Sequence, residues 1–163
     1  MNNNPRALLC IDYQNLYHKA REYGNDFHIL PYVEFLQGMY NLQREDVFVF
    51  MGRDFYRDMH INAKTYVNES GILRLSNHHR SSKEYDPVDG KMARKIKLAI
   101  HKNDIDIILV GSSDKIFANL GTLAWRWNKE FHVYPYADPA RKYSKHTATV
   151  QPIRDLIAPR IRF

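Results

Sequence analysis

The sequence predicts an α/β protein in which helices cover both faces of a doubly wound, mainly parallel sheet. Short apolar runs of strand length alternate along the chain with segments whose apolar residues recur at helical spacing. The runs at residues 7–11 and 105–110 are almost continuously apolar, which is typical of parallel strands covered on both faces. Because strands that alternate with helices are joined by right-handed crossovers, this order favours a single parallel sheet.

Turn residues and apolar spacing place the individual elements. Gly24 ends a helix over residues 15–23, and Pro31 suits the first turn of the next helix. One apolar stripe predicts a helix over residues 88–102, and the polar residues 76–84 before it are expected to form a loop. The remaining strands are expected at residues 47–51, 72–75 and 131–136, and the remaining helices at residues 55–69, 114–127 and 151–158.

Length and composition limit the class of protein. With 163 residues and 44% hydrophobic content, the chain is expected to fold as one domain over residues 1–163. No apolar run reaches the length of a membrane span, so no membrane partner is expected, and the first residues lack a signal-peptide pattern. The single cysteine, Cys10, lies in an apolar run and is expected to be a core residue in a reducing compartment. These features predict a cytoplasmic protein.

The chain carries a formal charge of +6, which points to an anionic partner and most simply to nucleic acid. Basic side chains could border a binding crevice as a phosphate-binding rim, although a solvated helix face is the ordinary explanation for the lysines. The rim candidates are Arg53, Arg57, Arg80, Lys83, Lys91 and Arg94. Aromatic residues beyond strand ends could stack unpaired bases or could simply cover the core. These are Tyr13, Tyr17, Phe55 and Tyr56.

Two acidic residues stand where buried strands are expected to end. Asp12 follows the first apolar run, with Asn15 three residues later, and Asp114 follows the run that ends at Val110. Parallel strands present their carboxyl ends at one edge of the sheet, where α/β proteins bind ligands, so these acids are expected to lie close together. The alternative is that each acid only caps the helix that follows it.

A third acid is expected at the start of the helix over residues 88–102. Asp89 lies on the same apolar stripe as Met92 and Ile96, and Asp86 is the alternative. Either could instead be a plain helix cap. Converging carboxylates repel one another unless a hard cation such as Mg²⁺ is bound between them. The chemistry that follows from such a site is metal-assisted hydrolysis of a phosphodiester.

Three segments carry a resemblance to a known family. Residues 7–15 (ALLCIDYQN), 83–89 (KEYDPVD) and 106–114 (DIILVGSSD) are similar to motifs of the NYN domain, in the LabA-like branch of the PIN-like ribonuclease superfamily. The resemblance spans nearly the whole chain. It implies a Rossmann-like, PIN-like sheet and an acidic pocket that binds Mg²⁺ or Mn²⁺ for RNA cleavage.

The resemblance also assigns residues. Asp12 takes the place of the first catalytic acid, and Asn15 that of an asparagine that positions the acid or the substrate. The second motif can be laid to end at Asp86 or at Asp89, and the stripe position favours Asp89. The third motif departs from the family pattern, because Lys115 follows Asp114 where relatives tend to carry another acid. This departure puts a two-metal mechanism in doubt.

The sequence therefore predicts a metal-dependent ribonuclease that cleaves RNA, single-stranded RNA in particular. Asp12, Asp89 and Asp114 are expected to hold one Mg²⁺ or Mn²⁺ ion, with Asp86 as the alternative second ligand. Asn15 and Ser112 would orient ligand waters or phosphate oxygens. The alternative is a non-catalytic RNA-binding or regulatory module with a degraded acidic site. The oligomeric state is open, a homo-oligomer included.

Overall fold

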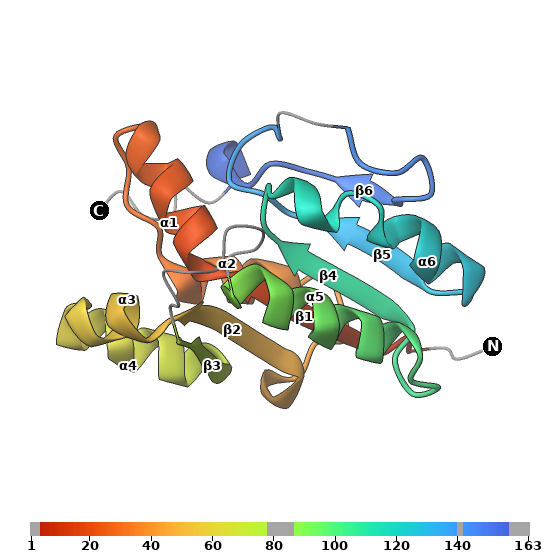
Figure 1. The fold of residues 1–163 in the computed structure, drawn as a ribbon, viewed down its shortest axis with the longest axis horizontal. Coiled ribbons are helices and arrows are strands. Elements are labelled where there is room, and N and C mark those ends of the chain that lie inside the picture. Colours follow the sequence, from red (N-terminus) through yellow and green to blue (C-terminus); the bar gives the residue numbers. More distant parts are fainter. Residues whose placement is uncertain (1–3, 78–86, 140–141, 157–163) are drawn as a thin grey trace.

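The computed structural model describes residues 4–77, 87–139 and 142–156. Its centre is a six-stranded sheet in which neighbouring strands run parallel, in the order β3-β2-β1-β4-β5-β6 (Figure 1). The strands are β1 (Ala7–Asp12), β2 (Val47–Gly52), β3 (Ile72–Ser76), β4 (Ile107–Gly111), β5 (Glu130–Val133) and β6 (Thr149–Val150). The predicted parallel α/β fold is confirmed.

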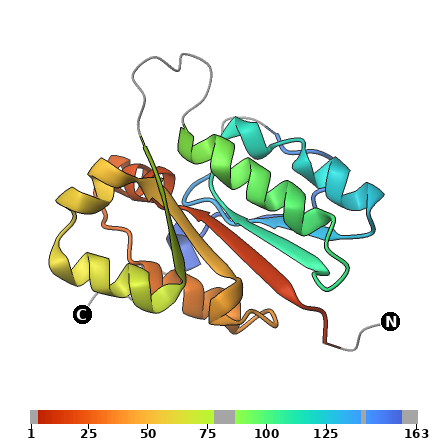
Figure 2. The same cartoon turned by 60° about the horizontal axis from the view of Figure 1, so that its bottom comes forward.

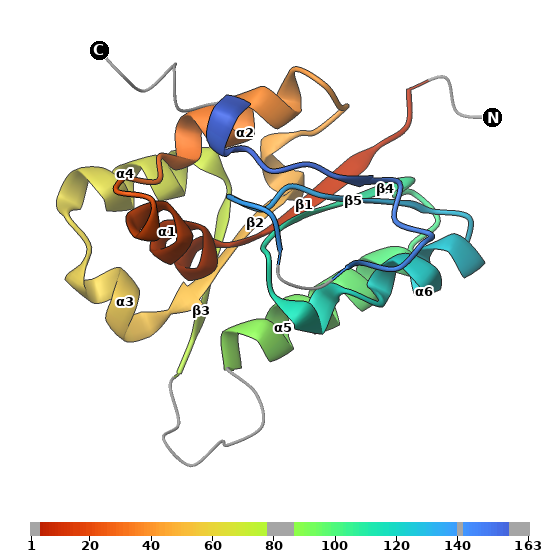
Figure 3. The same ribbon diagram turned by 90° about the horizontal axis from the view of Figure 1, so that it is seen from above.

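Helices cover both faces of this sheet, as predicted. They are α1 (Tyr13–Glu22), α2 (Ile29–Gln37), α3 (Arg53–Asp58), α4 (Ile61–Ser70), α5 (Pro87–Ile100) and α6 (Leu120–Arg126), with short 3₁₀ helices η1 (Arg44–Asp46) and η2 (Lys115–Phe117). Figures 2 and 3 show α2 and α4 on one side of the sheet and α5 and α6 on the other. None of the helices in the described ranges is both long and apolar enough to span a bilayer.

The alternation of side chains along β1 explains this two-sided core. Leu9 and Ile11 pack in an apolar cluster with α1, α2 and α4, whereas Leu8 and Cys10 pack in a second cluster with α5 and α6. Burial raises the pKa of the Cys10 thiol to about 12, so the thiol stays protonated. The prediction that Cys10 is a core residue is confirmed.

Strand order fixes where a ligand can bind. The chain winds outward from β1 through β2 to β3 and then returns to β4 on the other side of β1. The winding direction therefore reverses between β1 and β4. In open α/β sheets, the crevice beyond the carboxyl ends of the strands at this switch point is where ligands bind.

Several predicted boundaries were wrong for local reasons. The single helix expected over residues 55–69 is two helices, α3 and α4, because the chain is extended at Met59 and His60 and the His60 side chain caps α4. The helix expected over residues 114–127 begins as η2 and continues as α6 after a break. The strand expected over residues 131–136 ends before Pro135, which has no N–H to donate to a ladder.

Two further differences concern the ends of the chain. The two-residue strand β6 was not predicted, because two residues are too short to show a periodic pattern. Of the helix expected over residues 151–158, residues 154–156 are helical and residues 157–158 lie outside the described ranges. Residues 78–84 of the expected loop also lie outside them.

At the amino ends of the central strands, one arginine joins three segments. Arg6 donates two hydrogen bonds to the buried Asp46 carboxylate, at 2.8 and 2.7 Å, and one to Asp104 at 2.8 Å. Its own backbone N–H donates to Asp106 at 2.9 Å. These contacts connect the start of β1 with the segments that lead into β2 and β4.

Arg6→Met is expected to lower the free energy of unfolding by about 2–3 kcal/mol, because it leaves the buried Asp46 carboxylate without its bidentate partner. Arg6 is itself more than one third exposed, so water reaches the site and limits the loss. Urea denaturation of the variant and of Arg6→Lys, which keeps the charge, measures the effect. A loss below about 0.5 kcal/mol, the range of ordinary surface substitutions, would contradict it.

Candidate metal centre

Three carboxylates from separate segments meet at the switch point. Asp12 ends β1, Asp114 follows β4, and Asp89 lies in the first turn of α5. One oxygen from each of the three side chains lies within 4.8 Å of the other two. We call these three residues the acid cluster. The predicted proximity of Asp12 to Asp114 is thus found in the structure.

Asp12 is 5% exposed and is held in place by the helix that it starts. Its Oδ1 accepts a hydrogen bond from the backbone N–H of Asn15 at 3.1 Å, so Asp12 is the N-cap of α1. Capping and metal binding are compatible, because a carboxylate has a second oxygen and several lone pairs. Asp12 can therefore be both a helix N-cap and a member of an acidic site, the two interpretations that the sequence left open.

Asp114 is fixed in the same way. Its Oδ1 accepts from the N–H of Ile116 at 3.3 Å, and its own N–H donates to the Ser112 hydroxyl at 3.1 Å. The backbone of the turn thereby sets the direction of the carboxylate. Lys115, the next residue, is exposed.

Asp89 is the half-buried member of the acid cluster that α5 contributes. Burial, the negative charge of Asp12 and a hydrogen bond with Asp114 together raise the pKa of Asp89 from its ordinary 3.8 to about 9. Without a cation, the cluster therefore holds a proton at neutral pH. Asp86, the alternative ligand, lies outside the described residues.

Neighbouring side chains clamp the first turn of α1 to the strands on both sides. Gln14 Oε1 accepts from the N–H of Gly52 at the end of β2, at 2.7 Å. Asn15 Oδ1 accepts from the N–H and the hydroxyl of Ser113, at 3.0 and 3.1 Å. Asn15 therefore ties α1 to the loop that carries Asp114. Ser112 is fully buried, and its hydroxyl accepts from the Asp114 N–H, which supports a role in shaping that loop.

Sequence reasoning missed Tyr143, which braces the same loop. Its hydroxyl donates to the carbonyl oxygens of Ser112 and Asp114, at 3.3 and 3.1 Å. Burial and the nearby charge of Asp114 raise the pKa of Tyr143, so its hydroxyl remains a donor. No local signal identifies this residue, because its partners lie about thirty residues earlier in the chain.

Tyr143→Phe is expected to weaken Mn²⁺ binding several-fold and to lower the free energy of unfolding by about 1 kcal/mol, because one hydroxyl holds two carbonyls of the ligand loop. Tyr136→Phe is the matched control, since the Tyr136 hydroxyl accepts from Asn25 at 2.9 Å, away from the acid cluster. Isothermal titration with Mn²⁺ compares them. Equal Mn²⁺ affinity in the two variants would show that Tyr143 does not position the ligands.

The described members of the predicted phosphate-binding rim are exposed. Arg53, at the start of α3, donates to Asn77 at 2.7 Å, and Lys91 on α5 donates to the carbonyl of Leu75 at 2.9 Å. Arg57 is held by Asp54 and Asp58, at 3.3 and 3.1 Å. Arg94 lies on the outer face of α5, and Arg80 and Lys83 lie outside the described residues.

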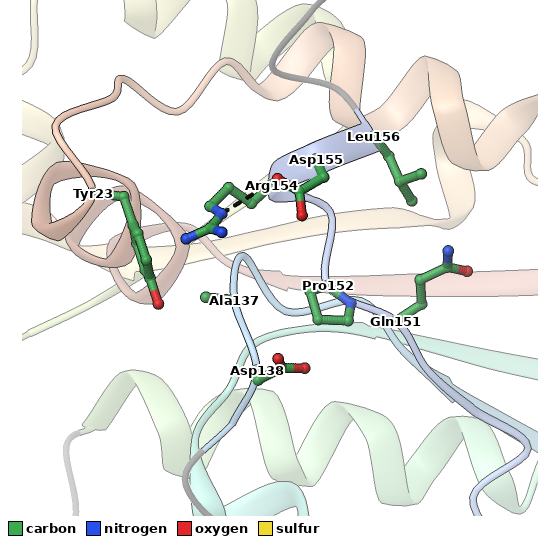
Figure 4. Close-up of a pocket in the computed structure, with 8 residues that line it drawn as sticks. All are labelled: Tyr23, Ala137, Asp138, Gln151, Pro152, Arg154, Asp155 and Leu156. Carbon is green, nitrogen blue, oxygen red and sulfur yellow. Dashed lines mark ion pairs between the residues drawn. The ribbon is translucent and has the colours of Figure 1, made fainter.

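A separate hollow of about 370 Å³ lies beyond β5, near the end of α1 (Figure 4). The Arg154 guanidinium lies over the Tyr23 ring, 4.3 Å from its centroid, and is paired with Asp155. Asp138, Gln151 and Pro152 also line this hollow. None of the acid cluster lines it, so the two features are distinct.

The fold and the acid cluster together define an α/β protein with three carboxylates at its switch point, a set that could hold a metal ion. A family model described as the NYN domain matches residues 6–151. The chain therefore belongs to the NYN domain family, as its motifs indicated. No curated protein sequence matches it.

A solved structure has a similar fold. It is the crystal structure of a protein of unknown function from Vibrio parahaemolyticus, with a TM-score of 0.68 and 17% sequence identity. The alignment covers 94% of this chain and 95% of the other. At this identity, the likeness concerns the fold alone.

Proposed function

We propose that this protein is a metal-dependent ribonuclease that cleaves RNA phosphodiester bonds at the acid cluster. The observation that carries the proposal is the convergence of Asp12, Asp89 and Asp114, with oxygens within 4.8 Å of one another, at the ligand-binding edge of a NYN domain. We also infer that the chain forms a single domain of the LabA-like branch and acts in the cytoplasm. One continuous sheet supports the single domain, a lone buried thiol supports the cytoplasm, and the LabA-like branch rests on the motif resemblance of residues 7–15 and 106–114.

The residues present suit a divalent cation. One oxygen from each of the three carboxylates lies within 4.8 Å of the other two, so small side-chain rotations could bring all three to one divalent ion. All three are hard carboxylate oxygens, which Mg²⁺ and Mn²⁺ prefer. Besides burial, the charges of Asp12 and Asp114 raise the pKa of Asp89, and a bound cation would relieve this repulsion.

Each side chain has a defined task in this proposal. Asp12 and Asp114 are oriented by the caps that they form, so little side-chain entropy is lost when they bind the ion. Asp89 would complete the ligand set of a divalent ion and would give up its proton on binding. Asn15 acts as a positioning residue, because it holds the Asp12 helix against the Asp114 loop. The bound ion would polarise the scissile phosphate and activate a water.

RNA is the proposed substrate, and three features support it. Membership of the NYN family suggests RNA, and the formal charge of +6 favours a polyanion. Exposed basic residues flank the acid cluster in sequence, with Lys91 and Arg94 on the helix of Asp89 and Lys115 beside Asp114. Lys115 in place of a further acid favours a mechanism with one ion.

The test is cleavage of a labelled single-stranded RNA by the wild-type protein in Mn²⁺ and in EDTA. Cleavage is expected only in Mn²⁺, while RNA binding in EDTA should persist and weaken as salt rises, because bound phosphates release counterions. Tight, salt-sensitive binding without cleavage in any metal would identify the alternative, a non-catalytic RNA-binding module. If the protein neither cleaves nor binds RNA, the proposal is overturned.

A further inference from the structure

The two sides of the first turns of α1 carry different chemistry. Asp12 and Asn15 take part in the acid cluster and its supports, whereas Tyr13 and Tyr17 stack on each other with ring centroids 6.4 Å apart and planes inclined by 15°. The ring of Phe55, from α3, meets Tyr13 and Tyr17 edge-on at 6.0 and 5.4 Å. An aromatic cluster therefore begins one residue after Asp12.

Two adjoining hollows open on this cluster. They have volumes of about 310 and 400 Å³ and share Tyr13, Tyr17, His60 and Ala63 as lining residues. We call the two together the aromatic cavity. Their sizes are within the range of pockets that hold small organic ligands. Figure 3 shows α1 close to α3 and α4, the helices that provide the walls.

The wall formed by α3 is only loosely joined to the core. No residue of α3 is fully buried, and Phe55 and Met59 pack against the core cluster while remaining partly exposed. Tyr17 is likewise half-buried. Tyr13 is buried in the core cluster, so Tyr17 and Phe55 are the rings through which the aromatic cavity meets solvent.

Polar groups stand around this apolar lining. Asp58 lies at one hollow, and Asp26 and His28 lie at the other. His60 accepts a hydrogen bond from Asn62 N–H through Nδ1, so its neutral ring carries a proton on Nε2 and can donate. Flat apolar walls edged by donors and acceptors match a nucleobase, which has π-faces and a polar edge.

We propose that the aromatic cavity binds an unpaired nucleobase of the RNA strand that is held at the acid cluster. Tyr13 follows Asp12 directly, and Tyr17 lies about 6 Å further along the helix axis. We therefore place the base of a nucleotide near the scissile phosphate in this cavity. This inference rests on the proposed function and adds a base-binding subsite to it.

The experiment combines a protein change with an RNA change. Tyr17→Leu keeps apolar bulk but removes the ring, and a single abasic nucleotide, moved along a short single-stranded RNA, removes one base. Trp125→Leu is the control, because Trp125 is an exposed ring on α6, which packs on the other face of the sheet. Fluorescence anisotropy in EDTA measures affinity, and Mn²⁺-dependent cleavage is followed in parallel.

Tyr17→Leu is expected to weaken binding of intact RNA about 5- to 30-fold, as loss of one stacked base does, while Trp125→Leu has no effect. An abasic nucleotide at one position should weaken binding to the wild type and leave binding to Tyr17→Leu unchanged. Phe55→Leu should reproduce this pattern, and circular dichroism identifies any variant that fails to fold.

Other results are equally decisive. If Tyr17→Leu and Phe55→Leu bind and cleave like an active wild type, the subsite is refuted and the proposed function stands. If abasic RNA remains sensitive to the Tyr17→Leu change, the ring supports the fold and not a base, which also refutes the subsite. If the wild type neither binds nor cleaves RNA, the proposed function itself fails.

Discussion

Asp114→Asn is expected to lower the rate of Mn²⁺-dependent RNA cleavage by about two to three orders of magnitude. The reason is that Lys115 stands where a second acid could also have bound the ion, so Asp114 is the carboxylate that this turn offers to the ion. A bound metal supplies several kcal/mol of transition-state stabilisation, and each 1.4 kcal/mol corresponds to about a factor of ten in rate.

Folding should survive this change. Asn caps a helix about as well as Asp, so the hydrogen bond to the Ile116 N–H can be kept. Removing one charge from a cluster of three acids also relieves repulsion in the metal-free protein. The melting temperature without metal should therefore stay the same or rise slightly.

Parallel assays of Asp12→Asn and Asp104→Asn complete the test. Asp12→Asn should be as inactive as Asp114→Asn, whereas Asp104 lies at the opposite edge of the sheet and pairs with Arg6, so its variant should cleave normally. Equal cleavage by all the proteins would point to a contaminating nuclease and would remove the evidence for the site.

The ends of β1 and β4 could be predicted from sequence, because their information is local. Five apolar residues before Asp12, and residues 105–110, apolar except for Asp106, before Asp114, locate both strands, and parallel topology then places both acids at one edge. Asp89 could be predicted as well, since its apolar stripe shows which side of α5 faces the sheet. The sequence set helix capping and the acidic site as alternatives for each acid. In the structure, Asp12 and Asp114 each cap a helix and also lie in the acid cluster.

What could not be predicted depends on contacts between distant segments. The bond from Tyr143 to Asp114 links two loops that have no regular pattern. The break between α3 and α4 could not be predicted, because no Gly or Pro marks it in the sequence. His60 caps α4 with a ring nitrogen instead. The role predicted for Ser112, to orient ligand waters or phosphate oxygens, stays a prediction, and its full burial follows from tertiary packing that its sequence neighbourhood does not reveal.

Asp89→Asn should separate the effect of the acid cluster on stability without metal from its contribution to Mn²⁺ binding. In the metal-free protein, Asp89 has a raised pKa of about 9, so it is neutral at pH 7 and an asparagine imitates that state. The variant should therefore be at least as stable as the wild type without metal. At a Mn²⁺ concentration 100 times the dissociation constant, binding should stabilise the wild type by about 2.7 kcal/mol, and the variant should gain almost nothing.

The pH dependence has a definite sign. An acid whose pKa is raised in the folded state contributes stability that is fully present below its ordinary pKa, here 3.8, and that is lost as pH rises through about 9. Between these values, the metal-free wild type should lose stability relative to Asp89→Asn. Because Mn²⁺ must displace the proton, its stabilising effect on the wild type should grow over the same range. Thermal melts from pH 5 to pH 9, with and without Mn²⁺, measure both trends, and parallel curves for the two proteins would show that Asp89 is not in the cluster.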